Sequence, residues 1–306
     1  MKVLKLAHNA GGGHISVAKA LKEEFEKNNI ESLLAYSNIS IKEVKYYDDK
    51  KNAWNYIIKV VPSVGKVLYV LGNVYDNIKL LSSKSILYGM NKIYGKNLEA
   101  FIRENHFDVI IVTHMFPGET LTFLNNKKDK SIHFITINTD YYYASLQNEL
   151  DSDYWVISSK DLTCKFIKMG INKKKILPFG IPVSSSFNSK IDVNETKKKL
   201  NIPLDKKIIL IMNGSLGNGN VNRYIDKVIK YYGDDIYIIV VCAKNKRLKK
   251  KLDRCYKNDI KVLGFVNNIS EYMNTCDVLI TKPGGISITE AAVVNVPIIL
   301  TNPIPG

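Results

Sequence analysis

Residues 280–300 read ITKPGGISITEAAVVNVPIIL, and this stretch indicates the fold class. An apolar run enters a Pro-Gly-Gly turn at 283–285, a helix-like stretch follows the turn, and a second apolar run ends the segment. Buried apolar strands that alternate with helices are typical of a parallel sheet covered on both faces. The segment therefore predicts an α/β fold with a glycine turn at the carboxyl end of a strand.

The same alternation occurs in two series along the chain. Apolar runs of the first series are VLKLAH (3–8), DVIIVTH (108–114), IHFITIN (132–138) and YWVISS (154–159). Those of the second series are KIILIMN (207–213), IYIIVVC (236–242), KVLGF (261–265), DVLITK (277–282) and PIIL (297–300). A polar stretch at 181–203 separates the two series. We expect two Rossmann-like, doubly wound domains, 1–185 and 200–306, with ligands in the cleft between them.

The composition is that of an ordinary globular protein, with 45% hydrophobic and 24% charged residues in 306. The longest apolar run, 236–243, is far too short to span a bilayer. The amino terminus lacks the apolar core of a signal peptide, so we expect no export. The four cysteines show no Cys-x-x-Cys spacing and are expected to be reduced thiols of a cytosolic protein.

Three glycine-rich turns follow predicted strands and open predicted helices: NAGGGH (9–14), NGSLGNGN (213–220) and KPGGISITE (282–290). Glycine lets a ligand approach the backbone closely, and a helix amino terminus attracts anions. Each turn alone is equally consistent with a tight connection between a strand and a helix. Taken together, the three turns favour a ligand that carries phosphate.

Individual polar residues in these turns also have structural explanations. Ser287-x-x-Glu290 has the spacing of a capping box, in which Glu290 only reaches back to the start of its helix. Thr289 is explained equally well as helix surface. His14 is explained equally well as a hydrogen-bonded residue of the first helical turn. Among the other histidines, His114 follows a strand and is expected to point toward the cleft.

On these motifs the sequence resembles the processive diacylglycerol glucosyltransferases and monogalactosyldiacylglycerol synthases of glycosyltransferase family 28. The resemblance rests on GGGHISVAKAL (11–21), FDVIIVTHMFP (107–117), TINTDYYYA (136–144), ILPFGIPV (176–183), KIILIMNGSLG (207–217) and the segment that opens this section. It implies a GT-B fold, a UDP-sugar donor, a diacylglycerol or glycolipid acceptor, and inversion at the anomeric carbon. It also implies that no metal is bound for catalysis and that no further cofactor is needed.

The resemblance places the donor in the second domain. The turn at 284–285 would meet the diphosphate, where a helix amino terminus stabilises the charge of departing UDP. Glu290 would accept hydrogen bonds from the ribose hydroxyls, and a loop at 214–217 would line the other side of the nucleotide. The donor-binding residues expected on this basis are Gly214, Ser215, Gly217, Gly284, Gly285, Ser287, Thr289 and Glu290.

The resemblance places the acceptor beside the first glycine turn. The acceptor hydroxyl must lose a proton to a base, and we expect His14 to be that catalytic base. Galactosyl members of the family tend to have Asp where this chain has Asn9, which weakly favours glucose over galactose. The other residues expected at the acceptor side of the cleft are Gly11, Gly12, Gly13, His114 and Asp140.

Residues 50–97 are basic and rich in aromatic side chains, with eight lysines against one acid. An amphipathic basic element of this kind lies in the interface of an anionic bilayer. We therefore expect a protein peripheral to the inner face of the cell membrane. The alternative is a helix packed against the first domain. The residues expected to contact the membrane are Trp54, Lys59, Lys66, Lys79 and Lys84.

The resemblance also concerns the end of the chain. Family members continue past a Pro-Ile-Pro-Gly like that at 303–306 with residues that contact the donor sugar and helices that complete the second domain. We expect a truncated second domain whose last strand leaves apolar surface uncovered. Other functions stay open: a peptidoglycan lipid-intermediate transferase, a UDP-sugar epimerase, or an inactive remnant that binds nucleotide or membrane. Nucleic-acid binding, which rests on the net charge of +15 alone, is not expected.

Overall fold

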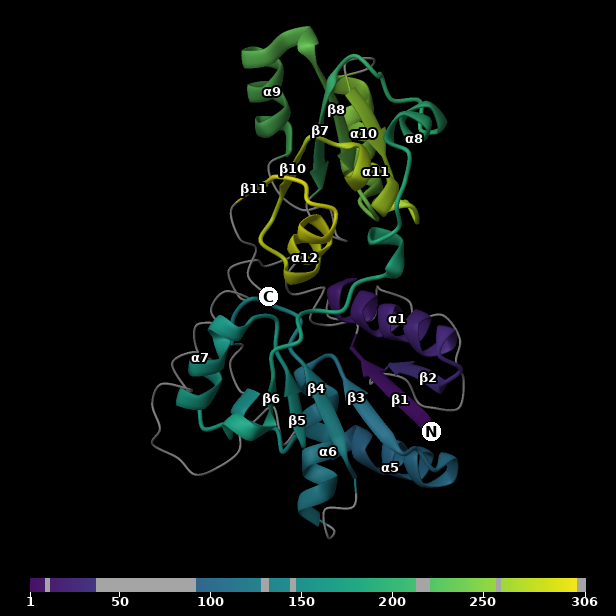
Figure 1. The fold of residues 1–306 in the computed structure, drawn as a ribbon, viewed down its shortest axis with the longest axis vertical. Helices are drawn as coiled ribbons and strands as arrows, with labels where there is room; N and C mark the ends of the chain where they lie inside the picture. Colours follow the sequence, from purple (N-terminus) through teal and green to yellow (C-terminus); the bar gives the residue numbers. More distant parts are fainter. Residues whose placement is uncertain are drawn as a thin grey trace. The chain divides into compact units, whose positions relative to one another are not determined.

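The computed structural model describes residues 1–8, 12–36, 92–127, 132–143, 147–212, 221–256 and 260–301. The chain divides into two compact units, one within Met1–Ser184 and the other within Ser185–Ile304. Figure 1 shows both units as sheets flanked by helices. The predicted α/β class with two parallel sheets is confirmed.

Unit 1 contains a six-stranded parallel sheet in the order β2-β1-β3-β4-β5-β6. Its strands are β1 (Lys2–Ala7), β2 (Glu31–Tyr36), β3 (Val109–Val112), β4 (Phe134–Ile137), β5 (Tyr154–Val156) and β6 (Ile176–Leu177). Its α-helices are α1 (Gly12–Lys27), α5 (Lys92–Asn105), α6 (Met115–Lys127) and α7 (Thr163–Lys168). The two edge strands of this sheet, β2 and β6, were not predicted from the sequence.

Helices cover both faces of this sheet. Alternate residues of β1 point to opposite faces, so Leu4 and Leu6 pack with Leu98 of α5 and Leu121 of α6. Lys5 points to the other face, where its ammonium group lies 5.3 Å from the centre of the Phe25 ring on α1. This arrangement is the doubly wound architecture that the alternating apolar runs predicted.

The strand order places a topological switch point at the centre of unit 1. From β1 the chain moves outward to β2, and β3 then returns to the opposite side of β1. The carboxyl ends of β1 and β3 are therefore neighbours, and the segments that leave them diverge. Ligands of open α/β sheets bind at this point, because the diverging connections leave a crevice between them.

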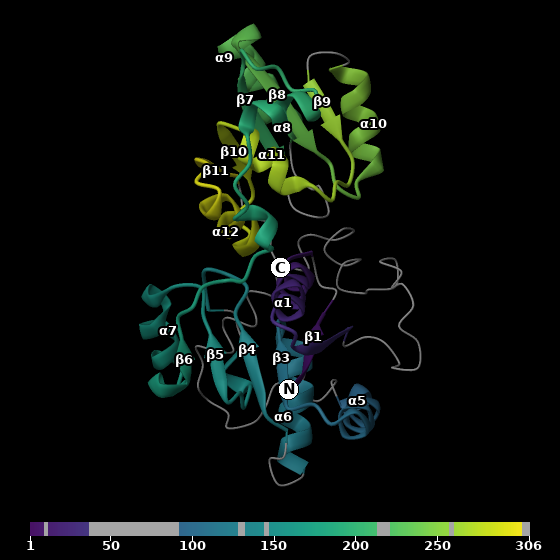
Figure 2. The ribbon, with the colours of Figure 1, turned by 45° about the vertical axis from the view of Figure 1, so that its right-hand side comes forward.

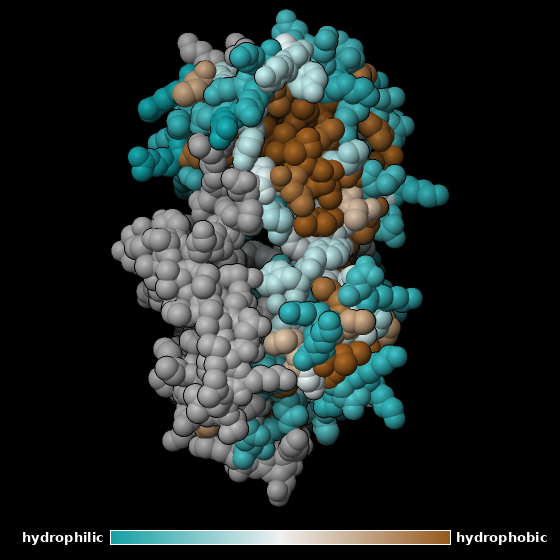
Figure 3. Space-filling view, turned by 90° about the vertical axis from the view of Figure 1, so that its left-hand side faces the viewer, coloured by the Kyte–Doolittle hydropathy of each residue, from teal (hydrophilic) through white to brown (hydrophobic). Residues whose placement is uncertain are grey.

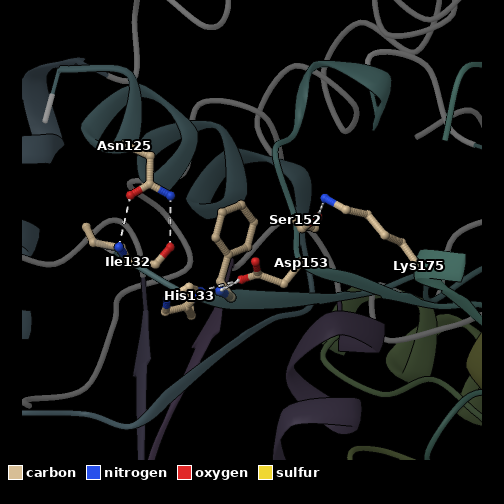
Figure 4. Close-up of polar contacts among 7 residues, drawn as sticks. Asn125, Ile132, His133, Ser152, Asp153 and Lys175 are labelled. Carbon is tan, nitrogen blue, oxygen red and sulfur yellow. Dashed lines mark hydrogen bonds and ion pairs between the residues drawn. The ribbon is translucent and has the colours of Figure 1, made fainter. Parts of the chain in front are cut away.

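Polar contacts at the amino ends of the strands fix the start of β4 (Figure 4). Asn125 of α6 accepts a hydrogen bond from the Ile132 amide (3.1 Å) and donates one to its carbonyl oxygen (2.8 Å). The Asp153 carboxylate accepts from the Phe134 amide at 2.9 Å, and the Lys175 ammonium donates to the Ser152 carbonyl at 2.9 Å. The first three of these bonds fix the residues that enter β4, whose carboxyl end leads to the candidate site.

Unit 2 contains a five-stranded parallel sheet in the order β11-β10-β7-β8-β9. Its strands are β7 (Lys207–Met212), β8 (Ile236–Val241), β9 (Ile260–Leu263), β10 (Val278–Thr281) and β11 (Ile298–Leu300). Its α-helices are α8 (Val193–Lys199), α9 (Val221–Tyr232), α10 (Lys246–Cys255), α11 (Ile269–Thr275) and α12 (Gly285–Val293). Figure 2 shows α10 on the outside of this unit beside β9.

The two faces of this second sheet also have separate cores. One core joins Ile209 and Ile211 of β7 to α9 and α10, and the other joins Leu210 of β7 to α11 and α12. The second core also includes Phe187 and Leu200. Part of the polar stretch expected to be a linker is therefore folded into unit 2, because its few apolar residues are buried there. The switch point of this sheet lies between β7 and β10.

An apolar patch is exposed on unit 2, on the side of β11 (Figure 3). Ile299 is 55% exposed and Leu300 is 53% exposed, although both belong to a strand of the sheet. The expectation that the last strand leaves apolar surface uncovered is confirmed. Among the helices described, none is long and apolar enough to cross a bilayer.

Candidate functional site

Three histidines meet at the switch point of unit 1, although His114 lies 100 residues beyond His14 in the sequence. His8 follows β1, His14 lies in the first turn of α1, and His114 follows β3. The ring centres of His14 and His114 are 4.5 Å apart in an edge-to-face contact, and those of His8 and His114 are 4.8 Å apart. Phe116 packs against both His8 and His114. The structure thus brings together His14 and His114, which were both predicted, and adds His8, which was not.

The hydrogen bonds of His14 fix its tautomer. Its Nδ1 lies 2.6 Å from the carbonyl oxygen of Thr113, which can only accept, so Nδ1 carries the proton. The Thr113 hydroxyl donates back to the His14 carbonyl at 3.0 Å, and the Thr139 hydroxyl lies 3.0 Å from Nδ1. In the neutral ring the lone pair is therefore on Nε2. This nitrogen is the one that can take a proton from a substrate.

His114 has the opposite tautomer. The backbone amide of Phe116 donates to His114 Nδ1 at 3.2 Å, so the proton of the neutral ring lies on Nε2. His114 is therefore a hydrogen-bond donor at Nε2, where His14 is an acceptor. Of the two neutral rings, only His14 has its lone pair on Nε2, where it can act as a base.

Burial lowers the pKa of all three histidines below the ordinary 6.5. For His8 the pKa falls to about 4, through burial and then through the charge of His14. Burial, and then the charges of His14 and His8, lower the pKa of His114 well below 6.5. Burial is also the largest effect on the pKa of His14, but the Asp140 carboxylate and the Thr113 hydrogen bond oppose it. Among the three, His14 alone has a negative charge that favours its protonated form.

The turn after β4 holds Asp140 near His14. The Asp140 carbonyl accepts hydrogen bonds from the side-chain amide of Asn138 (2.9 Å) and from the Ser158 hydroxyl (2.7 Å). The side-chain amide of Asn138 also donates to the Tyr142 carbonyl. These bonds fix the backbone that carries the carboxylate. Asp140 was expected at the acceptor side, and the structure places it where its charge acts on His14.

In unit 2 the predicted glycine turn follows β10 at the switch point. Gly284 is the amino-terminal cap of α12, and Gly285 is the first residue of the helix. The φ of Gly284 is −97°, which any residue can adopt, and an added Cβ would meet no atom closer than 3.9 Å. Neither conformation nor packing inside the described chain therefore requires glycine here. Close approach of a ligand to the backbone would require it.

The capping box proposed for Ser287 and Glu290 is wrong. The helix begins at Gly285, two residues before Ser287, and no side chain caps its first turn. Ser287 is thus inside the helix and Glu290 in its second turn, so the pair does not occupy the N-cap and N3 positions of a capping box. Burial raises its pKa to about 8. Thr289 donates to the Gly285 carbonyl at 2.7 Å, within the helix.

A hollow of about 500 Å³ opens at the carboxyl ends of β8 and β9. The sequence did not predict this hollow, because its residues lie on two separate connections. The exposed Phe265 follows β9, at the end of the run KVLGF that was predicted to be a strand. An aromatic residue at the carboxyl end of a predicted strand was the feature of the sequence that could have indicated this hollow. The hollow is lined by Ala243, Lys244, Lys246, Lys249, Gly264 and Phe265.

Several predicted site residues lie outside the described part of the chain. They are Gly11 of the first turn, Gly214, Ser215 and Gly217 of the second turn, and the membrane residues Trp54, Lys59, Lys66, Lys79 and Lys84. Gly12 and Gly13 form the first residues of α1, immediately before His14. Within the described ranges, no three His, Cys, Asp or Glu side chains are grouped so that they could hold a metal ion.

Solved structures with two such units show that this chain has the GT-B fold of glycosyltransferases. Anabaena HepE in complex with UDP and glucose matches 99% of this chain and 81% of its own, at 15% identity and a TM-score of 0.54. MurG of Acinetobacter baumannii matches 99% of this chain and 78% of its own, at 13% identity and a TM-score of 0.56. The UDP-GlcNAc 2-epimerase of Neisseria meningitidis matches 98% of this chain and 82% of its own, at 14% identity and a TM-score of 0.58. At these identities the likeness concerns the fold alone.

Sequence relatives narrow the class to one family. Residues 14–183 match the family model of monogalactosyldiacylglycerol (MGDG) synthase, and residues 192–306 match that of glycosyl transferases group 1. The processive diacylglycerol β-glucosyltransferases of Bacillus pumilus and Bacillus subtilis are each 30% identical over 314 aligned residues, which cover 100% of this chain and 78% of the relative. The chain belongs to the MGDG synthase family of glycosyltransferases, as the sequence motifs implied.

Proposed function

We propose that the protein transfers a hexosyl group, glucose in preference to galactose, from a UDP-sugar to diacylglycerol or a glycolipid, with inversion. The relatives at 30% identity are named diacylglycerol β-glucosyltransferases, and Asn9 stands where galactosyl members tend to have Asp. The observation that carries the proposal is the His14 tautomer at the switch point of unit 1. This tautomer leaves Nε2 unprotonated and able to accept a proton, in a chain that belongs to this family.

Unit 2 would bind the donor. The diphosphate would lie against Gly284 and the amino terminus of α12, where the helix dipole favours an anion. Glu290 would accept hydrogen bonds from the ribose hydroxyls. The hollow beside Phe265 would take the uracil ring, because it opens at the same edge of the sheet and offers an aromatic face.

Unit 1 would bind the acceptor and start the reaction. The acceptor hydroxyl gives its proton to His14 Nε2 while its oxygen forms a bond to the anomeric carbon. The bond between that carbon and the phosphate oxygen breaks, and UDP leaves with the electron pair. The amino terminus of α12 stabilises the negative charge that grows on the phosphate. We expect no metal ion or further cofactor in this scheme.

Because the acceptor is a lipid, we propose that the protein works at the inner face of the cell membrane as a peripheral protein. The basic aromatic segment at 50–97 supports this placement through its composition. The substitutions expected to weaken contact with anionic lipid are those of Trp54, Lys59, Lys66, Lys79 and Lys84.

The proposal is tested by product analysis with the whole chain. Labelled UDP-glucose and detergent-dispersed diacylglycerol should yield glucosyldiacylglycerol, and UDP-galactose should react more slowly. Release of free or epimerised sugar with no lipid product would contradict lipid transfer. Transfer to a peptidoglycan lipid intermediate in place of diacylglycerol would contradict the acceptor.

A matched variant tests the donor site separately. Gly284→Ala should lower the free energy of unfolding by no more than about 1 kcal/mol, because the added methyl group meets no close neighbour and the remaining cost is that of alanine at a helix amino-terminal cap. It should weaken UDP binding about tenfold or more, because the methyl group lies where the diphosphate approaches. Unchanged affinity for UDP in calorimetry would show that this turn does not hold the nucleotide.

A further inference from the structure

Helix α10 of unit 2 has a strongly basic outer face. The helix reads KRLKKKLDRC, with six basic residues and one acid. Leu252 is fully buried and Leu248 packs partly buried against the same core, so these residues fix which side of the helix faces the sheet. With 3.6 residues per turn, four basic residues at positions i, i+3, i+4 and i+7 form one stripe outside the core-facing side. We call them the α10 stripe: Arg247, Lys250, Lys251 and Arg254.

The charges of the stripe are not neutralised by the chain that the structure describes. The acid of the helix, Asp253, lies outside the stripe and forms an ion pair with Lys249 at 2.8 Å. None of the ion pairs among the described residues includes a member of the stripe. All four side chains belong to exposed residues. Unit 2 thus presents four free cations along a single helix face.

Two helices of unit 1 pair a basic residue with an acid one turn away. Lys22 pairs with Glu26 in α1 at 3.4 Å, and Arg103 pairs with Glu99 in α5 at 3.1 Å. In the stripe, by contrast, each residue has another cation three or four positions away, and such like-charged neighbours destabilise a helix. The fold therefore keeps a local repulsion that an external anionic partner would relieve.

We propose that the α10 stripe is a second membrane contact, which docks unit 2 on anionic lipid headgroups independently of the segment at 50–97. A bilayer of anionic lipid presents many phosphates in one plane, and four cations on one straight helix face can meet such a plane together. The stripe residues are absent from the lining of the hollow beside Phe265, so contact with lipid leaves that hollow free. The choice of lipid as partner rests on the proposed lipid acceptor.

Co-sedimentation with vesicles tests the proposal on the whole chain. The variant Arg247→Gln/Lys250→Gln/Lys251→Gln/Arg254→Gln removes the stripe. A matched control, Lys165→Gln/Lys168→Gln/Lys173→Gln/Lys174→Gln, removes the same charge from exposed residues of unit 1. We use vesicles of equal parts phosphatidylglycerol and phosphatidylcholine at low salt. The partition coefficient of the stripe variant onto these vesicles should be at least about tenfold lower than that of wild type. The control should partition within about twofold of wild type.

Two results would overturn the inference. Equal losses in the stripe variant and the control would show that net charge, rather than this surface, governs binding. Binding of short duplex DNA as tight as vesicle binding at the same ionic strength, lost in the stripe variant, would make the stripe a nucleic-acid surface.

The same variants separate this inference from the proposed function. UDP affinity and transfer to detergent-dispersed diacylglycerol should be unchanged in the stripe variant, because neither assay contains a bilayer. If wild type makes no glycolipid but the vesicle results hold, the stripe stands as a lipid contact and the proposed function fails. If transfer occurs and the stripe variant still binds vesicles like wild type, the stripe inference alone fails.

Discussion

Affinity for UDP should rise with pH through the ionisation of Glu290, and the Glu290→Gln variant should lose that rise. Burial raises the pKa of this carboxyl group to about 8, so it is mostly protonated at neutral pH. Ribose hydroxyls that donate hydrogen bonds prefer the ionised carboxylate as acceptor. Binding of the nucleotide should therefore select the minor, ionised form.

The size of the change in UDP affinity follows from the pKa of Glu290. With a pKa of about 8, roughly one carboxyl group in eleven is ionised at pH 7 and about ten in eleven at pH 9. The apparent dissociation constant scales inversely with the competent fraction, so it should fall about tenfold between these two values of pH. At pH 7, binding of one UDP should release about 0.9 proton from Glu290.

Isothermal titration calorimetry measures both quantities. Titrations at pH 7 in two buffers of different ionisation enthalpy give the number of protons released, and a series from pH 7 to pH 9 gives the change in affinity. The Glu290→Gln variant keeps the size of the side chain and removes its titration. Because the phosphate of UDP titrates equally in both proteins, the difference between them isolates Glu290. Identical pH dependence and proton release in wild type and variant would refute a ribose contact by the carboxylate.

Three further predictions concern unit 1. Burial lowers the pKa of Lys5 from 10.5 to about 8, so Lys5→Met should stabilise the unit at pH 7 by up to about 3 kcal/mol. The free energy of unfolding of the wild type should approach that of the variant as the pH rises from 8 to 10.5, since the folded state loses its proton first; denaturant unfolding followed by tryptophan fluorescence measures this, with the exposed Lys19→Met as the matched control. His14→Gln should lower sugar transfer by about 10²–10⁴-fold and leave UDP affinity in calorimetry unchanged; a normal rate would assign the base elsewhere. Asp140→Asn should move the acidic limb of the pH–rate profile to lower pH, because the Asp140 charge raises the pKa of His14, and an unmoved limb would contradict that coupling.

The amino-acid sequence by itself determined the fold class and the family. Apolar runs such as 207–213 and 236–242 are continuous because a parallel sheet is buried on both faces, so their pattern is visible without any knowledge of their neighbours. The glycine turn at 284–285 was equally visible, because a local turn depends on the residues within it. The short edge strand β6 was missed because its two residues, Ile176–Leu177, give no periodic signal.

The start of α12 shows where local patterns mislead. The spacing of Ser287 and Glu290 fits a capping box, but the helix starts at Gly285, so the fit to the motif had no structural meaning. The raised pKa of Glu290 was also invisible in the sequence. Burial depends on what the rest of unit 2 places around the carboxyl group.

Only the tertiary structure decided how the histidines act. The order β2-β1-β3 brings the carboxyl end of β3 beside that of β1, and it thereby joins His14 to Thr113, 99 residues away. The contact fixes the proton on Nδ1 and leaves Nε2 as the base. No local pattern encodes this, because the pairing of strands distant in sequence is settled by the packing of the whole sheet.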